Sequence, residues 1–102
     1  LHVVRQRGLN PGAHETALRQ ATQGMRALLP ESVSDWCTPH LRVGFGDRAH
    51  EILRVAREVR PDLLVIGARP GLRASSHLPW TTVAEILAGA PCPVLAVRAH
   101  YA

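Results

Sequence analysis

Apolar residues follow two alternating patterns along this chain, and together these patterns predict its secondary structure. Short apolar runs bounded by polar residues, glycine or proline are typical of strands, whereas apolar residues that recur every three or four positions are typical of helices. Four segments fit the strand pattern: residues 1–5, 40–44, 62–67 and 94–97. Three segments fit the helix pattern: residues 13–29, the stretch between Asp47 and Pro61, and residues 82–90.

Capping and breaking residues support these helices. Asn10 can cap the first helix, Pro11 suits its first turn, and Asp47 can cap the second helix. Each helix is predicted to bury one apolar stripe. In chain order the three stripes are Ala17, Leu18, Ala21, Met25, Leu28 and Leu29, then Ala49, Ile52, Leu53, Ala56 and Val59, then Val83, Ile86 and Leu87.

Strands that alternate with helices predict right-handed βαβ units and a parallel α/β sheet. The run Asp62–Gly67 does not alternate in polarity, which predicts a strand buried on both faces by flanking helices. Ligands of such sheets bind beyond the carboxyl ends of the strands, where the strand order reverses. The loop Ala68–Pro79 follows this strand, is longer than most connections and contains glycine, so we expect a binding site there.

Composition excludes several classes of protein. At 102 residues, with 46% apolar and 20% charged residues, the chain fits one small globular domain over residues 1–102. No apolar run approaches the ~20 residues of a membrane helix, and the first residues do not resemble a signal peptide. Two cysteines are too few for a disulfide framework, so we expect a cytoplasmic protein with no membrane partner. The net charge of +4 comes from scattered arginines with only 4% aromatics, which argues against nucleic-acid binding.

The residues offer little for catalysis or metal binding. The six histidines never occur at ligand spacing, and no Cys/His cluster forms, so we expect no metal site. Ser75-Ser76-His77 places hydroxyls beside a histidine, but adjacent side chains seldom face each other as a nucleophile and its base must. We therefore expect no enzymatic activity and no catalytic residue.

An ordered set of motifs resembles the universal stress protein family, most strongly over the last sixty or so residues. The segments are Val43-Gly44-Phe45-Gly46-Asp47, Glu51-Ile52-Leu53, Asp62-Leu63-Leu64-Val65-Ile66-Gly67, Gly67-Ala68-Arg69-Pro70-Gly71, Trp80-Thr81 and Ala90-Pro91-Cys92-Pro93-Val94-Leu95-Ala96-Val97-Arg98. The resemblance implies a flavodoxin- or Rossmann-like fold, of the type also found in adenine nucleotide alpha hydrolases.

His2-Val3-Val4 resembles the family's second strand, so the resemblance implies that the usual first strand, which is central in the sheet, is missing. An aspartate that resembles a ribose- or phosphate-side contact would be missing with it. Three explanations remain open: the chain is a fragment, a neighbour fills the gap, or the two flanking strands pair directly.

The nucleotide-binding branch of that family carries glycine, two residues, glycine, nine residues, glycine and then serine or threonine. Placed on this chain, those positions are Gly67, Pro70, Trp80 and Thr81, so the spacing is kept and two glycines are lost. Pro70 has no N–H to give to a phosphate, and Trp80 puts a ring where the backbone would approach one. The resemblance therefore implies a degenerate nucleotide-binding loop and no cofactor.

An alternative keeps ATP with Mg²⁺ as ligand. Val3 and Ile66 would then line the base, while a group of four residues would flank the ribose and phosphates: Gly67, Arg69, Thr81 and Thr82. Gly71 could replace Pro70 if the loop took another path. Trp80 has two interpretations of its own: its ring fills the vacated pocket against Val83 and Leu87, or it stacks on a different planar ligand.

The last predicted strand indicates a partner. It is apolar and would form an edge of the sheet, and proteins usually cover such edges. The resemblance implies antiparallel pairing of two copies across a two-fold axis, through Val94, Leu95, Ala96 and Val97. We therefore expect a non-enzymatic homodimer that acts in stress response or signalling through protein contacts, with the ATP-binding module as the alternative.

Overall fold

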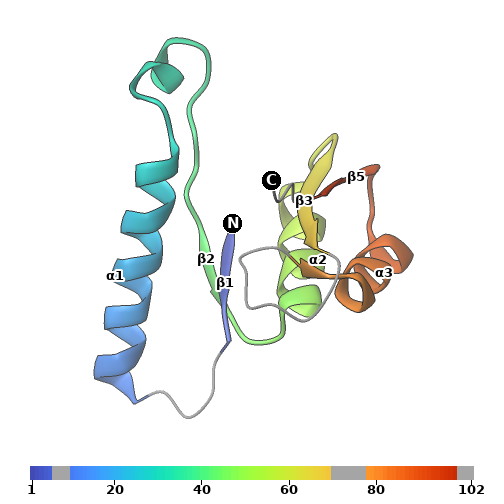
Figure 1. Ribbon diagram of the computed structural model, residues 1–102, viewed down its shortest axis with the longest axis horizontal. Helices are drawn as coiled ribbons and strands as arrows, with labels where there is room; N and C mark the ends of the chain where they lie inside the picture. The colour runs from blue at the N-terminus through green and yellow to red at the C-terminus, as the bar shows by residue number, and fades with distance from the viewer. Residues whose placement is uncertain (6–9, 70–77, 99–102) are drawn as a thin grey trace. The chain divides into compact units, whose positions relative to one another are not determined.

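The computed structural model describes residues 1–5, 10–69 and 78–98 (Figure 1). The chain divides into two compact units, Leu1–Arg48 and Ala49–Ala102. Each unit is described by itself. No helix in the described ranges is both long and apolar enough to cross a membrane.

The first unit is a strand–helix–strand element. Strand β1 (His2–Val4) pairs in parallel with β2 (Val43–Phe45), with Val3 opposite Gly44. The His2 N–H donates to the Arg42 carbonyl and the Gly46 N–H donates to the Val4 carbonyl, both at 2.9 Å. The parallel pairing confirms a βα-β arrangement here, although both strands are shorter than the sequence predicts.

Helix α1 (Pro11–Leu28) begins where the capping residues predict. The Asn10 side-chain oxygen accepts a hydrogen bond from the Ala13 N–H at 2.8 Å, and Pro11 occupies the first turn. This satisfies one of the donors that a helix start leaves free. The His14 ring stacks on Phe45 with centroids 3.8 Å apart, which holds α1 against β2.

The prediction of a buried stripe on α1 is wrong in this structure. None of its residues is buried, Leu18 is 40% exposed and Leu28 is 83% exposed. The helix is about 27 Å long at 1.5 Å per residue, whereas each three-residue strand spans only about 10 Å. Two such strands cannot cover the length of the helix. After α1, the short 3₁₀ helix η1 (Glu31–Asp35) occupies part of the predicted polar loop.

The second unit carries the larger sheet. Its elements are α2 (Arg48–Val59), β3 (Leu64–Arg69), β4 (Leu78–Pro79), α3 (Trp80–Gly89) and β5 (Val94–Arg98). The strands lie in the order β4-β3-β5 and all pairs are parallel. Ile66 lies opposite Ala96, and Ala68 lies opposite Leu78. Within each unit the strands therefore form one parallel sheet, β1-β2 in the first and β4-β3-β5 in the second, which confirms the predicted α/β class.

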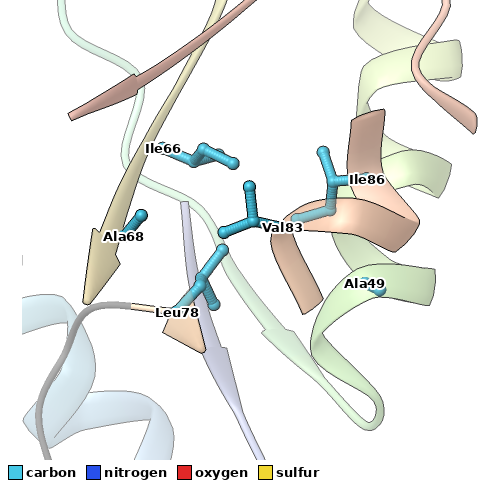
Figure 2. Close-up of a cluster of buried hydrophobic side chains, with 6 residues drawn as sticks. All are labelled: Ala49, Ile66, Ala68, Leu78, Val83 and Ile86. Atoms are coloured by element: carbon cyan, nitrogen blue, oxygen red, sulfur yellow. The ribbon is translucent and has the colours of Figure 1, made fainter. Parts of the chain in front are cut away.

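The core of the second unit lies on one face of this sheet. Its buried side chains come from the strands and from both helices, as Figure 2 shows: Ala49, Ile66, Ala68, Leu78, Val83 and Ile86. Ile52, Leu53, Leu64 and Val94 pack against this cluster while partly buried. The predicted apolar stripes of α2 and α3 are thus largely confirmed. Their exceptions are Val59, 59% exposed, and Leu87, 55% exposed.

The prediction that β3 is buried on both faces is wrong in this structure. Ile66 and Ala68 are 6% and 0% exposed, but Val65, the residue before Ile66, points to the other face of the strand and is 56% exposed. On β5, Leu95 lies opposite Val65 and is 51% exposed. Val97, two residues further along β5, lies on the same face and is 47% exposed. We call Val65, Leu95 and Val97 the open face. It is open because α2 and α3 both contribute to the cluster on the opposite, Ile66 face.

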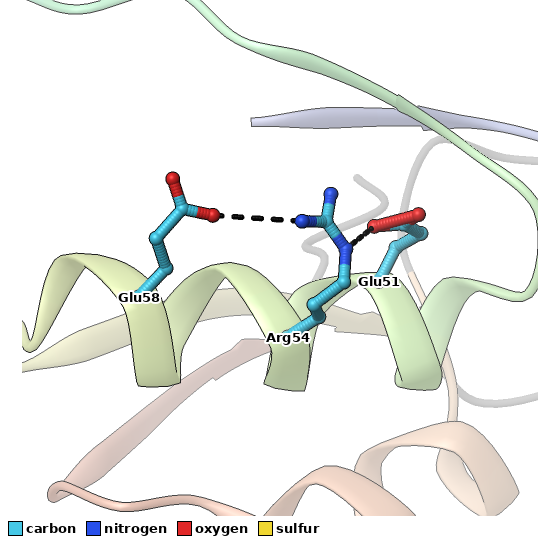
Figure 3. Close-up of polar contacts among 3 residues, drawn as sticks. All are labelled: Glu51, Arg54 and Glu58. Carbon is cyan, nitrogen blue, oxygen red and sulfur yellow. Dashed lines mark hydrogen bonds and ion pairs between the residues drawn. The ribbon is translucent and has the colours of Figure 1, made fainter.

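The solvent-facing side of α2 carries an ion-pair network. The Arg54 guanidinium donates to Glu51 at 2.7 Å and to Glu58 at 3.5 Å (Figure 3). The spacings of three and four residues place these groups on one helix surface. Ion pairs on a helix surface contribute a few tenths of a kcal/mol each, so this network gives the helix modest support.

Candidate functional site

The carboxyl end of β3 and the start of α3 form the candidate site. Ala68 and Arg69, the last residues of β3, lie opposite Leu78 and Pro79 of β4. Because α3 begins at the next residue, Trp80, its first turn starts beside the end of β3. Paired strands lie about 4.8 Å apart, so this register alone brings the two ends together. The geometry is the one that parallel α/β sheets use to hold ligands.

The first turn of α3 offers backbone donors. Its N-cap is Pro79, which makes no side-chain capping hydrogen bond, and the first turn contains no acidic residue. The first N–H groups of any helix have no partner within the helix and carry partial positive charge. Thr81 is exposed and Thr82 is half-buried in this turn. The start of α3 can therefore attract an anion.

The predicted site residues are spread over several environments. Ile66 is 6% exposed and belongs to the buried cluster, while Gly67 is half-buried at the next position of β3. Arg69 is the last residue of the strand. Val3 is half-buried in β1, in the first unit. Gly71 lies outside the described residues, as does Pro70. Within the described part, the structure brings together the end of β3 with Thr81 and Thr82.

The exposure of Trp80 disagrees with the interpretation in which its ring fills a vacated pocket against Leu87. The side chain is 49% exposed, and Leu87, two turns further along α3, is 55% exposed. A ring that filled a vacated pocket against Leu87 would be buried with it. Trp80 is thus about half exposed in the first turn of α3.

The other chemistry-bearing residues do not assemble into a site. No group of three metal-ligating side chains occurs within residues 1–5, 10–69 and 78–98. Cys37 is exposed in the first unit, and Cys92 is half-buried before β5 in the second. Ser75-Ser76-His77 lies outside the described ranges.

The predicted interface residues form strand β5, at the end of the three-stranded sheet. Val94 is half-buried, whereas the next four residues are exposed. The outer edge of β5 has no partner strand within the described part of the chain.

Sequence reasoning missed β4 and the early start of α3. The apolar pattern predicts this helix only from Thr82, and the family resemblance places Trp80-Thr81 at a helix start; in the structure both residues belong to the first turn. Pro79 was the available signal, because proline is frequent at helix starts. A hydrogen bond at the other end of α3 was not predicted either. The Arg57 side chain of α2 donates to the Gly89 carbonyl at 3.4 Å.

Comparison with known proteins identifies the family. The model of the universal stress protein family matches residues 3–98. No curated protein and no solved structure matches the chain significantly. The match spans both units and includes β3, α3 and β5. The chain therefore belongs to the universal stress protein family, with the general role in the response to stress that this membership brings.

Proposed function

We propose that this chain is a non-enzymatic homodimer that acts through protein contacts in stress response or signalling, with a nucleotide-binding loop that no longer holds ATP tightly. The observation that carries the proposal is the exposed apolar edge strand β5. Leu95 and Val97 are 51% and 47% exposed, and β5 ends the sheet. Long apolar edges with free backbone groups are prone to pair with other chains, and proteins usually cover them.

The backbone of β5 is suited to pairing with a second copy. The Leu64 N–H donates to the Pro93 carbonyl at 2.9 Å. Continued along a parallel ladder, this bond directs the N–H groups of Leu95 and Val97 toward β3 and that of Ala96 outward. An antiparallel pair of β5 strands around a two-fold axis would use the outward groups and join two sheets into one. It would also place the two open faces next to each other.

The molar mass in solution tests the dimer. We expect sedimentation equilibrium of the wild-type chain to give twice the chain mass, 11.1 kDa per chain. Leu95→Arg should give monomers, because like charges opposite each other across the axis destabilise a strand pair. Ala96→Pro should do the same, because it removes an outward donor and leaves the ladder to β3 intact.

Leu87→Arg is the matched control, since Leu87 is 55% exposed in the same unit but lies on α3. It should leave the dimer unchanged. A wild-type chain that is monomeric at all concentrations, or a Leu95→Arg variant that stays dimeric, contradicts the proposed interface.

Loss of tight ATP binding follows from two residues. Pro70 has no N–H to donate, and Trp80 places a side chain where the family motif has glycine. If the two changes together remove one or two charge-assisted hydrogen bonds of about 1.5–3 kcal/mol each, affinity falls by roughly one to four powers of ten. Ile66, which would line the base, is buried in the core and offers it little surface.

ATP binding is the second candidate function, and the uncapped start of α3 beside the end of β3 is the observation that favours it. A thermal shift separates the two. At 1 mM ATP, a Kd of about 10 μM stabilises by about 2.7 kcal/mol, which raises the Tm by roughly 10–20 °C. A Kd near 1 mM stabilises by only about 0.4 kcal/mol.

We expect ATP with Mg²⁺ to shift the Tm by less than about 3 °C. A shift above about 10 °C would contradict the degenerate loop and favour the ATP-binding module. We also expect no phosphate release from ATP, because no nucleophile and base meet near the candidate site in the described residues. We propose that this activity takes place in the cytoplasm, because two cysteines in 102 residues are too few for the disulfide framework that small secreted domains use.

A further inference from the structure

The first unit contains a hollow that the functions above do not use. It has a volume of about 400 Å³ and is lined by Thr22, Arg26, Leu29, Pro39, His40 and Leu41, and we call it the α1 pocket. Its walls are the last part of α1 and the segment that returns alongside the helix towards β2 (Figure 1). The volume is within the range of sites for small organic ligands.

The polar groups of the α1 pocket favour a negative charge. Thr22 and Arg26 lie four residues apart on α1, so they are neighbours on one helix surface. Arg26 and His40 are exposed, and neither side chain has a hydrogen bond or ion pair with another described residue. No carboxylate lines the pocket. The Arg26 guanidinium has no partner among the described residues and is therefore available to bind an anion.

The partial negative charge at the end of α1 affects which anion the pocket prefers. The carbonyl groups of the last helical turn carry partial negative charge, which weakens binding of a single negative charge about two- to fivefold. A charge-assisted hydrogen bond to arginine strengthens it by roughly ten- to a hundredfold, so the arginine dominates. A phosphate dianion doubles both the attraction to the guanidinium and the repulsion from the carbonyl groups, but it loses much more hydration than a carboxylate when it enters a hollow with three apolar lining residues. The balance favours a carboxylate.

The remaining wall residues define the rest of the ligand. Leu29, Pro39 and Leu41 are apolar and suit a short hydrocarbon or aromatic body. The Thr22 hydroxyl already donates to the Leu18 carbonyl at 2.8 Å, so toward the pocket it offers only its lone pairs. A bare oxyanion gains nothing from those lone pairs, which leaves Arg26 as the principal group for the charge.

We propose that the α1 pocket binds small apolar monocarboxylates, with Arg26 as the carboxylate-binding residue and His40 as a supporting donor. The bound carboxylate would lie against the guanidinium, and the apolar body would lie against Leu29, Pro39 and Leu41. The site belongs entirely to the first unit, so it is independent of the candidate nucleotide site.

Benzoate is a suitable probe, with benzamide as its neutral analogue and phenyl phosphate as the dianionic one. In a titration of the full ¹⁵N-labelled chain, we expect saturable backbone amide shifts at Thr22, Arg26 and Leu41. Benzamide and phenyl phosphate should each bind at least about fivefold more weakly than benzoate.

Variants test the assigned roles. Arg26→Gln should weaken benzoate binding at least tenfold, and His40→Gln about two- to fivefold. Arg19→Gln is the matched control, because Arg19 is an exposed arginine on the same helix that does not line the pocket, and it should leave binding unchanged. An unchanged circular dichroism spectrum verifies that each variant is folded.

Three results would overturn the proposal. They are the absence of saturable shifts with benzoate, equal binding by wild type and Arg26→Gln, and an equal loss in Arg19→Gln. Tighter binding of phenyl phosphate than of benzoate would overturn the assignment to monocarboxylates.

Discussion

Ile86 and Leu87 are consecutive residues of α3 with opposite environments, and this difference tests how the helix packs. Ile86 is 0% exposed and belongs to the buried cluster with Val83 and Ile66, whereas Leu87 is 55% exposed. Truncating either to alanine removes the same number of carbon atoms. A difference in stability between the two variants therefore reports packing and not the chemistry of the substitution.

The buried truncation should be much more costly. Large-to-alanine changes of fully buried aliphatic side chains destabilise by about 2–5 kcal/mol, because a cavity is left as well as transfer energy lost. Because Ile86 is 0% exposed within the cluster, we expect a loss of about 3 kcal/mol, in the middle of this range. Leu87→Ala leaves no cavity and improves helix propensity slightly, so we expect less than about 1 kcal/mol.

Each unit contains one tryptophan, which makes the assay specific. Trp36 lies in the first unit and is 71% exposed, and Trp80 begins α3 in the second. In a Trp36→Phe background, Trp80 fluorescence follows urea unfolding of the second unit alone. With a slope of about 1.5 kcal/mol per M, Ile86→Ala should lower the midpoint by about 2 M and Leu87→Ala by less than about 0.7 M.

If Ile86→Ala does not fold, Ile86→Val measures the same contact with an expected loss of about 0.5–1.5 kcal/mol. Equal midpoints for the two alanine variants would refute the assigned packing of α3. A larger loss in Leu87→Ala would show that the opposite side of the helix is the buried one.

Two further predictions concern the helices. Asn10→Ala removes the acceptor of the Ala13 N–H and should cost about 1 kcal/mol by thermal denaturation, whereas Asn10→Ser should stay close to wild type. Gly24→Ala should stabilise α1 by about 0.5–1 kcal/mol, because the new Cβ has no atom within 4 Å. Gly89→Ala should gain less or lose stability, because its Cβ would lie 2.9 Å from Leu53 Cδ1. Equal gains in the two glycine variants would show that Leu53 moves aside at no cost.

The sequence predicted element types well and burial less well, and the reason is physical. Asn10 at the start of α1 and the apolar spacing of α2 are local signals, and the structure confirms both. Whether Val65 or Leu28 is buried depends on how much surface is available to cover it. Local spacing contains no information on that amount. This is why both apolar side chains are exposed although they lie in elements that were predicted correctly.

The candidate site shows the same division. The resemblance to the family's nucleotide-binding motif named Gly67 and Thr81, and the structure places them in β3, close to its end, and in the first turn of α3. The register that joins these ends is a pairing of β3 with two residues of β4. A two-residue strand is too short to show a period of two, so no sequence pattern could predict it.

The start of α3 and the loop before it make separable contributions to nucleotide binding. Free N–H groups at a helix start arise from the fold itself, whatever the sequence of the loop. Their presence in α3 therefore does not show that the chain still binds ATP. The loop contribution depends on particular residues, and in this chain Pro70 and Trp80 stand at positions that are glycine in the family motif.

Pro70→Gly combined with Trp80→Gly should thus raise the Tm shift caused by ATP above that of the wild type. The matched control, Pro70→Ala with Trp80→Ala, restores an N–H at residue 70 and removes the indole without giving the backbone the freedom of glycine. A shift restored by the glycine pair alone would show that the loop needs left-handed backbone conformations. A shift restored equally by both pairs would assign the loss to the missing donor and the bulky ring. No increase with either pair would contradict the view that these two positions weaken nucleotide binding.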